Sequence, residues 1–170
     1  MTAPTGSPEL LTRAIDRVER ALGWLLALLM GVMVIDVVWQ VVSRFLLRAP
    51  SSFTEELAGF LLIWIGILGA AYGFRTRTHL GIDLLVSSLR GRTRRAVTIA
   101  AHVLVAAFAL ATMVIGGMLL VQLAFRLDQT SAAMGMRVAF VYLVLPLAGV
   151  LVILFSLESI AKAAAAEDDR

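Results

Sequence analysis

Three polar side chains in the first apolar stretch of the sequence are the first candidates for chemistry. Asp36, Gln40 and Arg44 are spaced four residues apart, so in a helix they share one face. An aspartate inside a bilayer costs about 2.5–3.5 kcal/mol on insertion scales, so it should face protein or water. One interpretation is a buried coupling-ion or proton site. The other is an interhelical hydrogen bond or a pair with Arg44, which we favour because one acid without a second polar cluster makes a poor ion site.

The two histidines, His79 and His102, are the other candidate ligands. They are too few for a zinc site with three ligands, and the sequence has no cysteine to supplement them. Haem iron accepts two axial histidines, so a haem-carrying four-helix membrane anchor is an alternative. His79 stands among arginines, however, where a histidine at a helix end interacts with the last carbonyl groups.

Enzyme motifs are absent from the sequence, which contains no GxSxG, HExxH, Walker loop or GxGxxG. A theoretical pI near 10.2 does not indicate nucleic acid here, because the arginines follow the pattern of a membrane protein. We therefore expect no catalytic activity, no cofactor, no metal site and no nucleic-acid partner.

The stretch that would position these side chains runs from residue 52 to 83. Ser52 and Glu55 have the spacing of a capping box, so the stretch should open as a helix. Residues 57–74 carry no charge and would reach about 27 Å at 1.5 Å per residue, close to the hydrocarbon thickness of a bilayer. Arg75 and His79 then follow at the other end. This pattern predicts an oriented membrane span.

The whole chain repeats this kind of block four times. Hydrophobic residues make up 60% of the 170 residues, above the roughly 45–50% of a soluble domain. We predict an all-α integral membrane protein with one domain, residues 10–161. Its four transmembrane helices are expected at about residues 22–47, 56–76, 97–125 and 138–160. Pro146 should kink the last of these helices, because its ring and missing N–H disrupt a regular turn.

The ends of the chain differ from this apolar domain. Residues 1–9 are predicted to be disordered, and residues 10–22 form an amphipathic lead-in that either lies on the membrane surface or extends the first span. Residues 162–170 form a polar tail. Eleven of the fifteen basic residues lie in the N-terminal segment, the central loop and the tail, so both termini should be cytoplasmic.

Small residues follow one another along the second span. Gly69 and Gly73 form a GxxxG pair, and Gly66 and Ala70 repeat the same spacing. Lipid gives helices no hydrophobic drive to associate, so close backbone approach between small residues supplies the contact. This face should pack either within the bundle or on another subunit.

The sequence resembles the small membrane subunit of tripartite ATP-independent periplasmic (TRAP) transporters. The resemblance rests on an ordered set of residues: Glu56, Trp64, Gly69-Ala70-Ala71, Arg75, His79 and Asp83, preceded by Arg44-Phe45 and followed by Thr130-Ser131, Met134-Gly135 and Tyr142 to Pro146. Asp36 and Arg137 depart from the family pattern. The chain length, the four predicted spans and the predicted cytoplasmic position of both termini agree with the family.

The resemblance implies a function. Such subunits partner a large membrane subunit, which carries the substrate and sodium sites, and a periplasmic protein that delivers the substrate, usually a carboxylate. The resemblance implies a multi-pass protein of the bacterial inner membrane that acts as a scaffold for the large subunit and contacts membrane lipids. Alternatives are a structural or haem-carrying anchor of another complex, or a small self-assembling exporter.

The resemblance also suggests roles for residues. Glu55, Glu56 and Asp128 would face the periplasm and help dock the binding protein. The glycine face of the second span, which is formed by Gly66, Gly69, Ala70 and Gly73, would contact the large subunit. Arg75, His79 and Asp83 would anchor the cytoplasmic end.

Overall fold

Four long helical spans make up the part of the chain that the structure describes. The structure is a computed structural model, and it describes residues 7–48, 51–76 and 92–165. The first two spans are α1 (Ser7–Phe45) and α2 (Ser52–Thr76). The third is built from α4 (Arg92–Phe108), the π-helical segment η1 (Ala109–Gly116) and α5 (Gly117–Arg126), and the fourth from α6 (Ala139–Tyr142) and α7 (Val144–Ala165). All four are long and apolar enough to cross a membrane, which confirms the predicted all-α membrane fold.

The first three spans begin before their predicted starts and the fourth ends after its predicted end, while the other four ends agree within two residues. The largest difference is in α1, which begins at Ser7, inside the stretch 1–9 for which we expected no structure. Pro8 lies in the first turn of this helix, where a missing N–H costs no intrahelical hydrogen bond. The amphipathic lead-in is therefore continuous with the first span instead of forming a separate surface helix.

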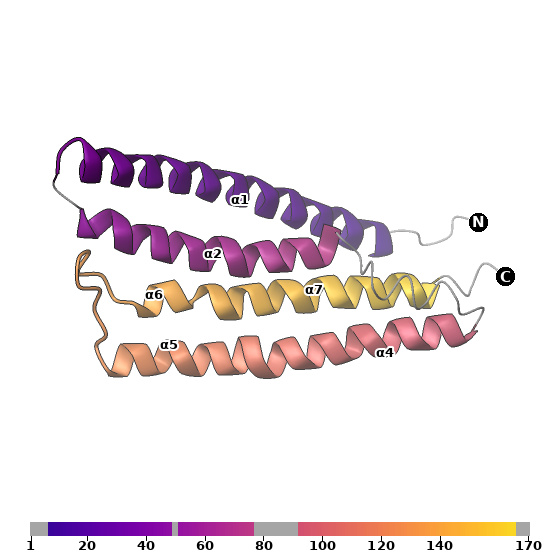
Figure 1. Cartoon of the computed structure of the whole chain (residues 1–170). Coiled ribbons are helices and arrows are strands. Elements are labelled where there is room, and N and C mark those ends of the chain that lie inside the picture. Colours follow the sequence, from indigo (N-terminus) through magenta and orange to yellow (C-terminus); the bar gives the residue numbers. More distant parts are fainter. Residues whose placement is uncertain (1–6, 49–50, 77–91, 166–170) are drawn as a thin grey trace.

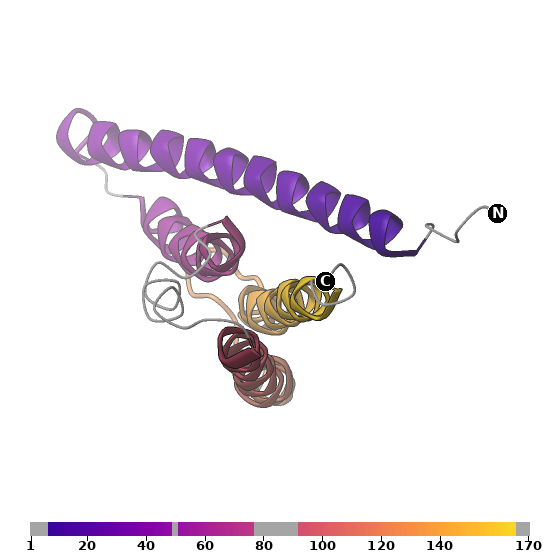
Figure 2. The ribbon, with the colours of Figure 1, turned by 90° about the vertical axis from the view of Figure 1, so that its right-hand side faces the viewer.

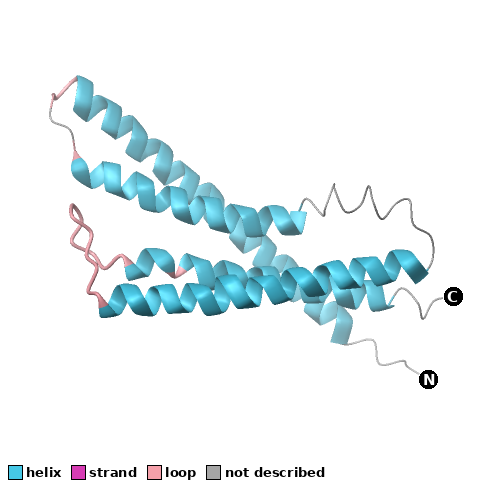
Figure 3. Cartoon of the chain, turned by 60° about the horizontal axis from the view of Figure 1, so that its bottom comes forward, coloured by secondary structure: helices cyan, strands magenta, loops and turns pink. Residues whose placement is uncertain are grey.

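The helices lie lengthwise beside one another, with α1 at one side of the bundle next to α2 (Figure 1). Seen from one end of the bundle, α2, α7 and the third span gather into one group, and α1 crosses them at an angle (Figure 2). The contacts agree, since α1 packs mainly on α2, while α7 packs on α2, α4 and η1. Of the connections between spans, the structure describes the α5–α6 loop and all of the α1–α2 connection except residues 49–50 (Figure 3). We call the end with the α1–α2 and α5–α6 connections the loop end, and the opposite end the charged end.

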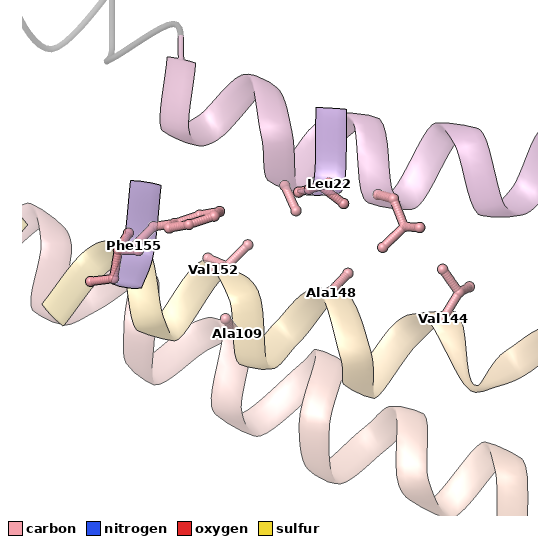
Figure 4. Packing of buried hydrophobic residues seen from close by; sticks show 9 residues of the cluster. Leu22, Ala109, Val144, Ala148, Val152 and Phe155 are labelled. Carbon is pink, nitrogen blue, oxygen red and sulfur yellow. The ribbon is translucent and has the colours of Figure 1, made fainter. Parts of the chain in front are cut away.

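The buried core follows α7, the most enclosed of the four spans. It is formed by apolar residues from every span, six of which are labelled in Figure 4: Ile15, Leu22, Leu68, Ala71, Ala109, Val144, Ala148, Val152 and Phe155. Large apolar side chains also cover the outside, among them Trp24 at 78% exposure and Leu104 at 72%. Such a surface suits contact with lipid chains, because exposing this much apolar area to water would be unfavourable.

Two glycines lie at close contacts between the third and fourth spans. A Cβ on Gly117 would lie 3.0 Å from Leu145 Cβ and Pro146 Cδ, and a Cβ on Gly149 would lie 2.8 Å from Met113 Cβ. Regular helix ends at Tyr142 and resumes at Val144, so the predicted kink takes the form of a break one turn before Pro146. That is where the proline ring would meet the carbonyl group of residue 142 in a regular helix.

Candidate functional site

The polar face of α1 makes a joint with α2 near the loop end. Asp36 is 6% exposed, and Gln40 Nε2 donates to its Oδ2 over 3.2 Å. The same amide donates to the backbone oxygen of Thr54 on α2 over 2.7 Å. Gln40 thus links a buried carboxylate on one helix to the first turn of the next. The arrangement suits the interhelical hydrogen bond that we favoured for this face.

Arg44, the third member of the predicted polar face, lies at the exposed end of α1. It lines a small cavity between the two helices together with Ser43, Ser51 and Glu55. Ser43 is buried, and its hydroxyl donates to the backbone oxygen of Gln40 over 3.0 Å. The joint therefore continues as a polar strip from Asp36 to the connection between α1 and α2.

A denser cluster of charges lies at the charged end, around Arg75. Its guanidinium reaches Asp16 Oδ1 at 3.1 Å, Glu19 Oε2 at 2.9 Å and Glu158 Oε2 at 2.9 Å. Lys162 Nζ lies 2.7 Å from the other oxygen of Glu158. One arginine of α2 therefore holds acids from α1 and α7, so that three helices meet at a single side chain.

Glu158 is the most buried member of this cluster, with its side chain 2% exposed. Its Oε2 lies 2.9 Å from Arg75 Nη1, and its Oε1 accepts a hydrogen bond from Arg75 Nη2 over 3.3 Å. The guanidinium carbon of Arg75 also lies 5.8 Å from the centre of the Phe155 ring, within cation–π range. A buried carboxylate needs such partners, because removing its charge from water is costly.

The carboxylate of Glu56 is engaged at the loop end. Its Oε2 accepts hydrogen bonds from the backbone N–H groups of Ala133 at 2.8 Å and Met134 at 3.2 Å. Met134 N–H also donates to Ser131 Oγ over 3.0 Å. Glu56 therefore fixes the α5–α6 loop against the start of α2.

The α5–α6 loop has a defined shape of its own. Thr130 pairs with Arg137 as an isolated bridge, and Gly135 turns the chain with a φ of +66°, a conformation that glycine adopts without strain. Asp128 lies 3.4 Å from Arg137 in an exposed ion pair. Of the three acids proposed for docking, two are thus occupied within the chain, and Glu55 is exposed.

The small residues of α2 face open space. A Cβ added at Gly66, Gly69 or Gly73 would have no neighbour within 4 Å, and Ala70 is exposed. Within the described chain this face is therefore not used for close packing. The close helix contacts are made instead at Gly117 and Gly149, which the GxxxG spacing did not indicate.

The remaining predicted residues have simpler settings. His102 is 5% exposed, and its Nδ1 lies 2.8 Å from the backbone oxygen of Thr98, so this nitrogen carries a proton. Trp64 lines an apolar groove beside Met134 and Met136 of the α5–α6 loop. His79 and Asp83 lie outside the described residues.

Sequence reasoning missed the acids of the charged end. The sequence patterns did not single out Asp16, Glu19 or Glu158. Their only local signal is the spacing of Asp16 and Glu19 along the flank of an apolar helix face, beside Ile15 and Leu22.

The fold and these polar joints define a class, a helical protein that crosses the membrane four times. The family model described as "Tripartite ATP-independent periplasmic transporters, DctQ component" matches residues 33–166. The chain therefore belongs to this family, as a small membrane subunit of TRAP transporters, and is a multi-pass protein of the inner membrane. Members of the family are transporter subunits and not enzymes.

Individual relatives agree with this membership. A putative TRAP transporter small permease protein of Haemophilus influenzae is 33% identical over 72 residues, which is 42% of this chain and 45% of that protein. The C4-dicarboxylate TRAP transporter small permease protein DctQ of Rhodobacter capsulatus is 44% identical over 43 residues, 25% of this chain and 19% of that protein. The sialic acid TRAP transporter small permease protein SiaQ of Vibrio cholerae is 27% identical over 88 residues. That match covers 52% of this chain and 51% of SiaQ, so the similarity spans about half of these relatives or less.

Proposed function

We propose that this chain is the small permease subunit of a sodium-driven TRAP transporter that takes up carboxylate substrates. The family match over residues 33–166 is the observation that carries the proposal. The named relatives serve transporters for C4-dicarboxylates and for sialic acid, and both kinds of substrate bear a carboxylate. In this arrangement the substrate and sodium sites belong to a large membrane subunit, and this chain braces it.

The open small-residue face of α2 supports the bracing role. Gly66, Gly69, Ala70 and Gly73 leave room on the outside of the bundle for the backbone of another helix. Close backbone approach of this kind is what holds helices together in lipid. We propose that a helix of the large subunit packs here.

The loop end is the proposed contact for the periplasmic binding protein. The arginine distribution favours both termini in the cytoplasm, which would place the α1–α2 connection and the α5–α6 loop outside. Glu56 holds this loop in a fixed shape, while Glu55 and the Asp128–Arg137 pair are exposed beside it. In this proposal Glu56 acts by positioning the loop, and Glu55 and Asp128 offer the charges.

Co-purification tests the bracing role. The chain, carrying an affinity tag, is expressed with the neighbouring large membrane subunit, and the amount of the large subunit recovered is measured. Gly69→Leu should reduce this recovery several-fold, because its side chain fills the proposed contact. Gly31→Leu is the matched control, since Gly31 lies on α1 and also faces open space. Equal recovery with Gly69→Leu and the unchanged chain would contradict the proposed packing face.

Reconstitution tests the transport role. We expect sodium-dependent uptake in proteoliposomes only when the small subunit, the large subunit and the binding protein are all present. Uptake of a carboxylate by this chain alone would contradict the role of a brace and favour a self-sufficient transporter.

A further inference from the structure

The charged side chains of residues 12–22 in α1 lie on different faces of the helix. At 3.6 residues per turn, Arg13, Arg17 and Arg20 fall within a sector of about 60°. This sector lies opposite the apolar face that packs on the bundle, which includes Ile15 and Leu22. The charge pattern of the segment is therefore decided by the positions of its two acids.

Those acids are turned toward the interior. Asp16 and Glu19 both pair with Arg75 of α2, at 3.1 and 2.9 Å. Arg17 and Arg20 remain exposed on the outer face, and the contact of Arg20 is with the neutral backbone oxygen of Asp16 at 3.4 Å. The segment has nearly equal numbers of acidic and basic residues. Its outward surface is nevertheless positive, because both acids pair with Arg75 on the inner side.

The depth of this surface follows from the length of the apolar stretch. Residues 21–43 carry a single charge and reach about 34 Å as a helix, slightly more than the hydrocarbon core of a bilayer. Arg17 and Arg20 therefore fall just beyond the core, at the level of the lipid headgroups. Trp24, 78% exposed, lies one turn deeper on the same face. Tryptophan is enriched at this boundary, where its ring is apolar and its N–H is polar.

We propose that Arg17 and Arg20, with Trp24 beneath them, bind the headgroup of an anionic phospholipid. Arginine suits this ligand because its planar guanidinium donates two parallel hydrogen bonds to phosphate oxygens. Anionic lipid is favoured over zwitterionic lipid because its headgroup carries no compensating cation. The proposed occupant is lipid, because both arginines sit at headgroup depth on the outer side of α1 (Figure 2), and a protein partner is the alternative that the experiment below tests.

Trp24 provides a local reporter for the experiment. The chain has three tryptophans, and the Trp39→Phe/Trp64→Phe variant keeps only Trp24. This full-length variant is reconstituted in phosphatidylcholine vesicles, and its fluorescence is quenched with brominated phosphatidylglycerol or brominated phosphatidylcholine. We expect phosphatidylglycerol to be preferred by about fivefold for each arginine that contacts it. Further substitution with Arg17→Gln and Arg20→Gln should remove the preference, while Arg17→Lys and Arg20→Lys should keep part of it.

Two controls restrict the interpretation. The Trp24→Phe/Trp64→Phe variant keeps Trp39, which lies near the loop end, and its quenching by the two lipids should not change when Arg17→Gln and Arg20→Gln are added. Arg44→Gln with Arg48→Gln removes two exposed charges at that same end and should leave the preference at Trp24 unchanged. Circular dichroism checks that each variant keeps its helices. Inorganic phosphate and chloride at equal ionic strength should weaken the preference equally, because the ligand is a lipid and not free phosphate.

Three results would overturn the proposal. The first is equal quenching of Trp24 by both lipids. The second is a preference that persists after both arginines become glutamine. The third is the absence of Trp24 quenching by either lipid when the large subunit is reconstituted with the chain, which would mean that a protein partner covers this face. If the glutamine variant loses its helices, the lysine variant and the salt dependence of the unchanged arginines decide the question.

Discussion

Arg75 of α2 and Glu158 of α7 form a buried ion pair whose Nη1 and Oε2 atoms lie 2.9 Å apart. The pair closes the charged end of the bundle, because Arg75 also holds Asp16 and Glu19 of α1. At the loop end, the amide of Gln40 joins α1 to α2. Since α1 packs mainly on α2, these two polar joints fix both ends of the helix that lies outermost.

Removing Arg75 should weaken the fold strongly. Arg75→Gln leaves Glu158 buried with Lys162 as its remaining cation, and breaking a buried pair costs about 3–5 kcal/mol. We expect a loss of that order in the free energy of unfolding, measured by denaturant titration in mixed micelles. Arg137→Gln is the matched control, since its pair with Asp128 is exposed and such pairs contribute about 0–1 kcal/mol. Similar losses for the two variants would contradict a structural role for the buried pair.

Neutralising Glu56 should release the α5–α6 loop. Glu56→Gln replaces charge-assisted hydrogen bonds to the N–H groups of Ala133 and Met134 with weaker ones. We expect hydrogen exchange at these two amides to become about tenfold faster, while exchange in α2 stays unchanged. Glu55→Gln, one residue away and exposed, should change neither rate. Unaltered protection in Glu56→Gln would show that the loop holds its shape without this carboxylate.

Adding one methyl group should distinguish the packed glycines from the open ones. Gly149→Ala places a Cβ 2.8 Å from Met113 Cβ, and overpacking of this kind costs about 1–3 kcal/mol. Gly66→Ala meets no atom within 4 Å and should stabilise α2 by about 0.5–1 kcal/mol, because alanine loses less backbone entropy in a helix. Unfolding of the isolated chain measures both effects. A stabilised Gly149→Ala variant would mean that the third and fourth spans separate easily.

The four spans could be predicted because a bilayer imposes their length and composition directly. Pro146 likewise marked a local disturbance, since its effect depends only on the turn before it. The partners of Arg75 could not be predicted, because Glu19 and Glu158 are 56 and 83 residues away in sequence and no periodic pattern links them. Small-residue spacing showed where a backbone can be approached, but not by which helix. It therefore indicated α2, whereas the close contacts within the chain are at Gly117 and Gly149.

Glu56 illustrates the same limit at the candidate site. Its position beside Glu55 in a first helical turn suggested a docking charge or an ordinary helix cap. Its hydrogen-bond partners are the backbone amides of a loop 77 residues away. Backbone donors leave no trace in the sequence, because every residue except proline has one.

Asp36 provides a test between a structural joint and an ion site. Asp36→Asn keeps an oxygen that can accept from Gln40 Nε2, so the link from Gln40 to Thr54 should persist. We expect sodium-dependent uptake by the complete reconstituted transporter to stay unchanged in this variant. Gln40→Leu, in contrast, leaves the carboxylate of Asp36 buried without this donor and should cost about 1–3 kcal/mol in unfolding free energy. Loss of sodium dependence in Asp36→Asn at normal stability would identify Asp36 as part of the coupling machinery, because removing its charge would then matter more than its hydrogen bond.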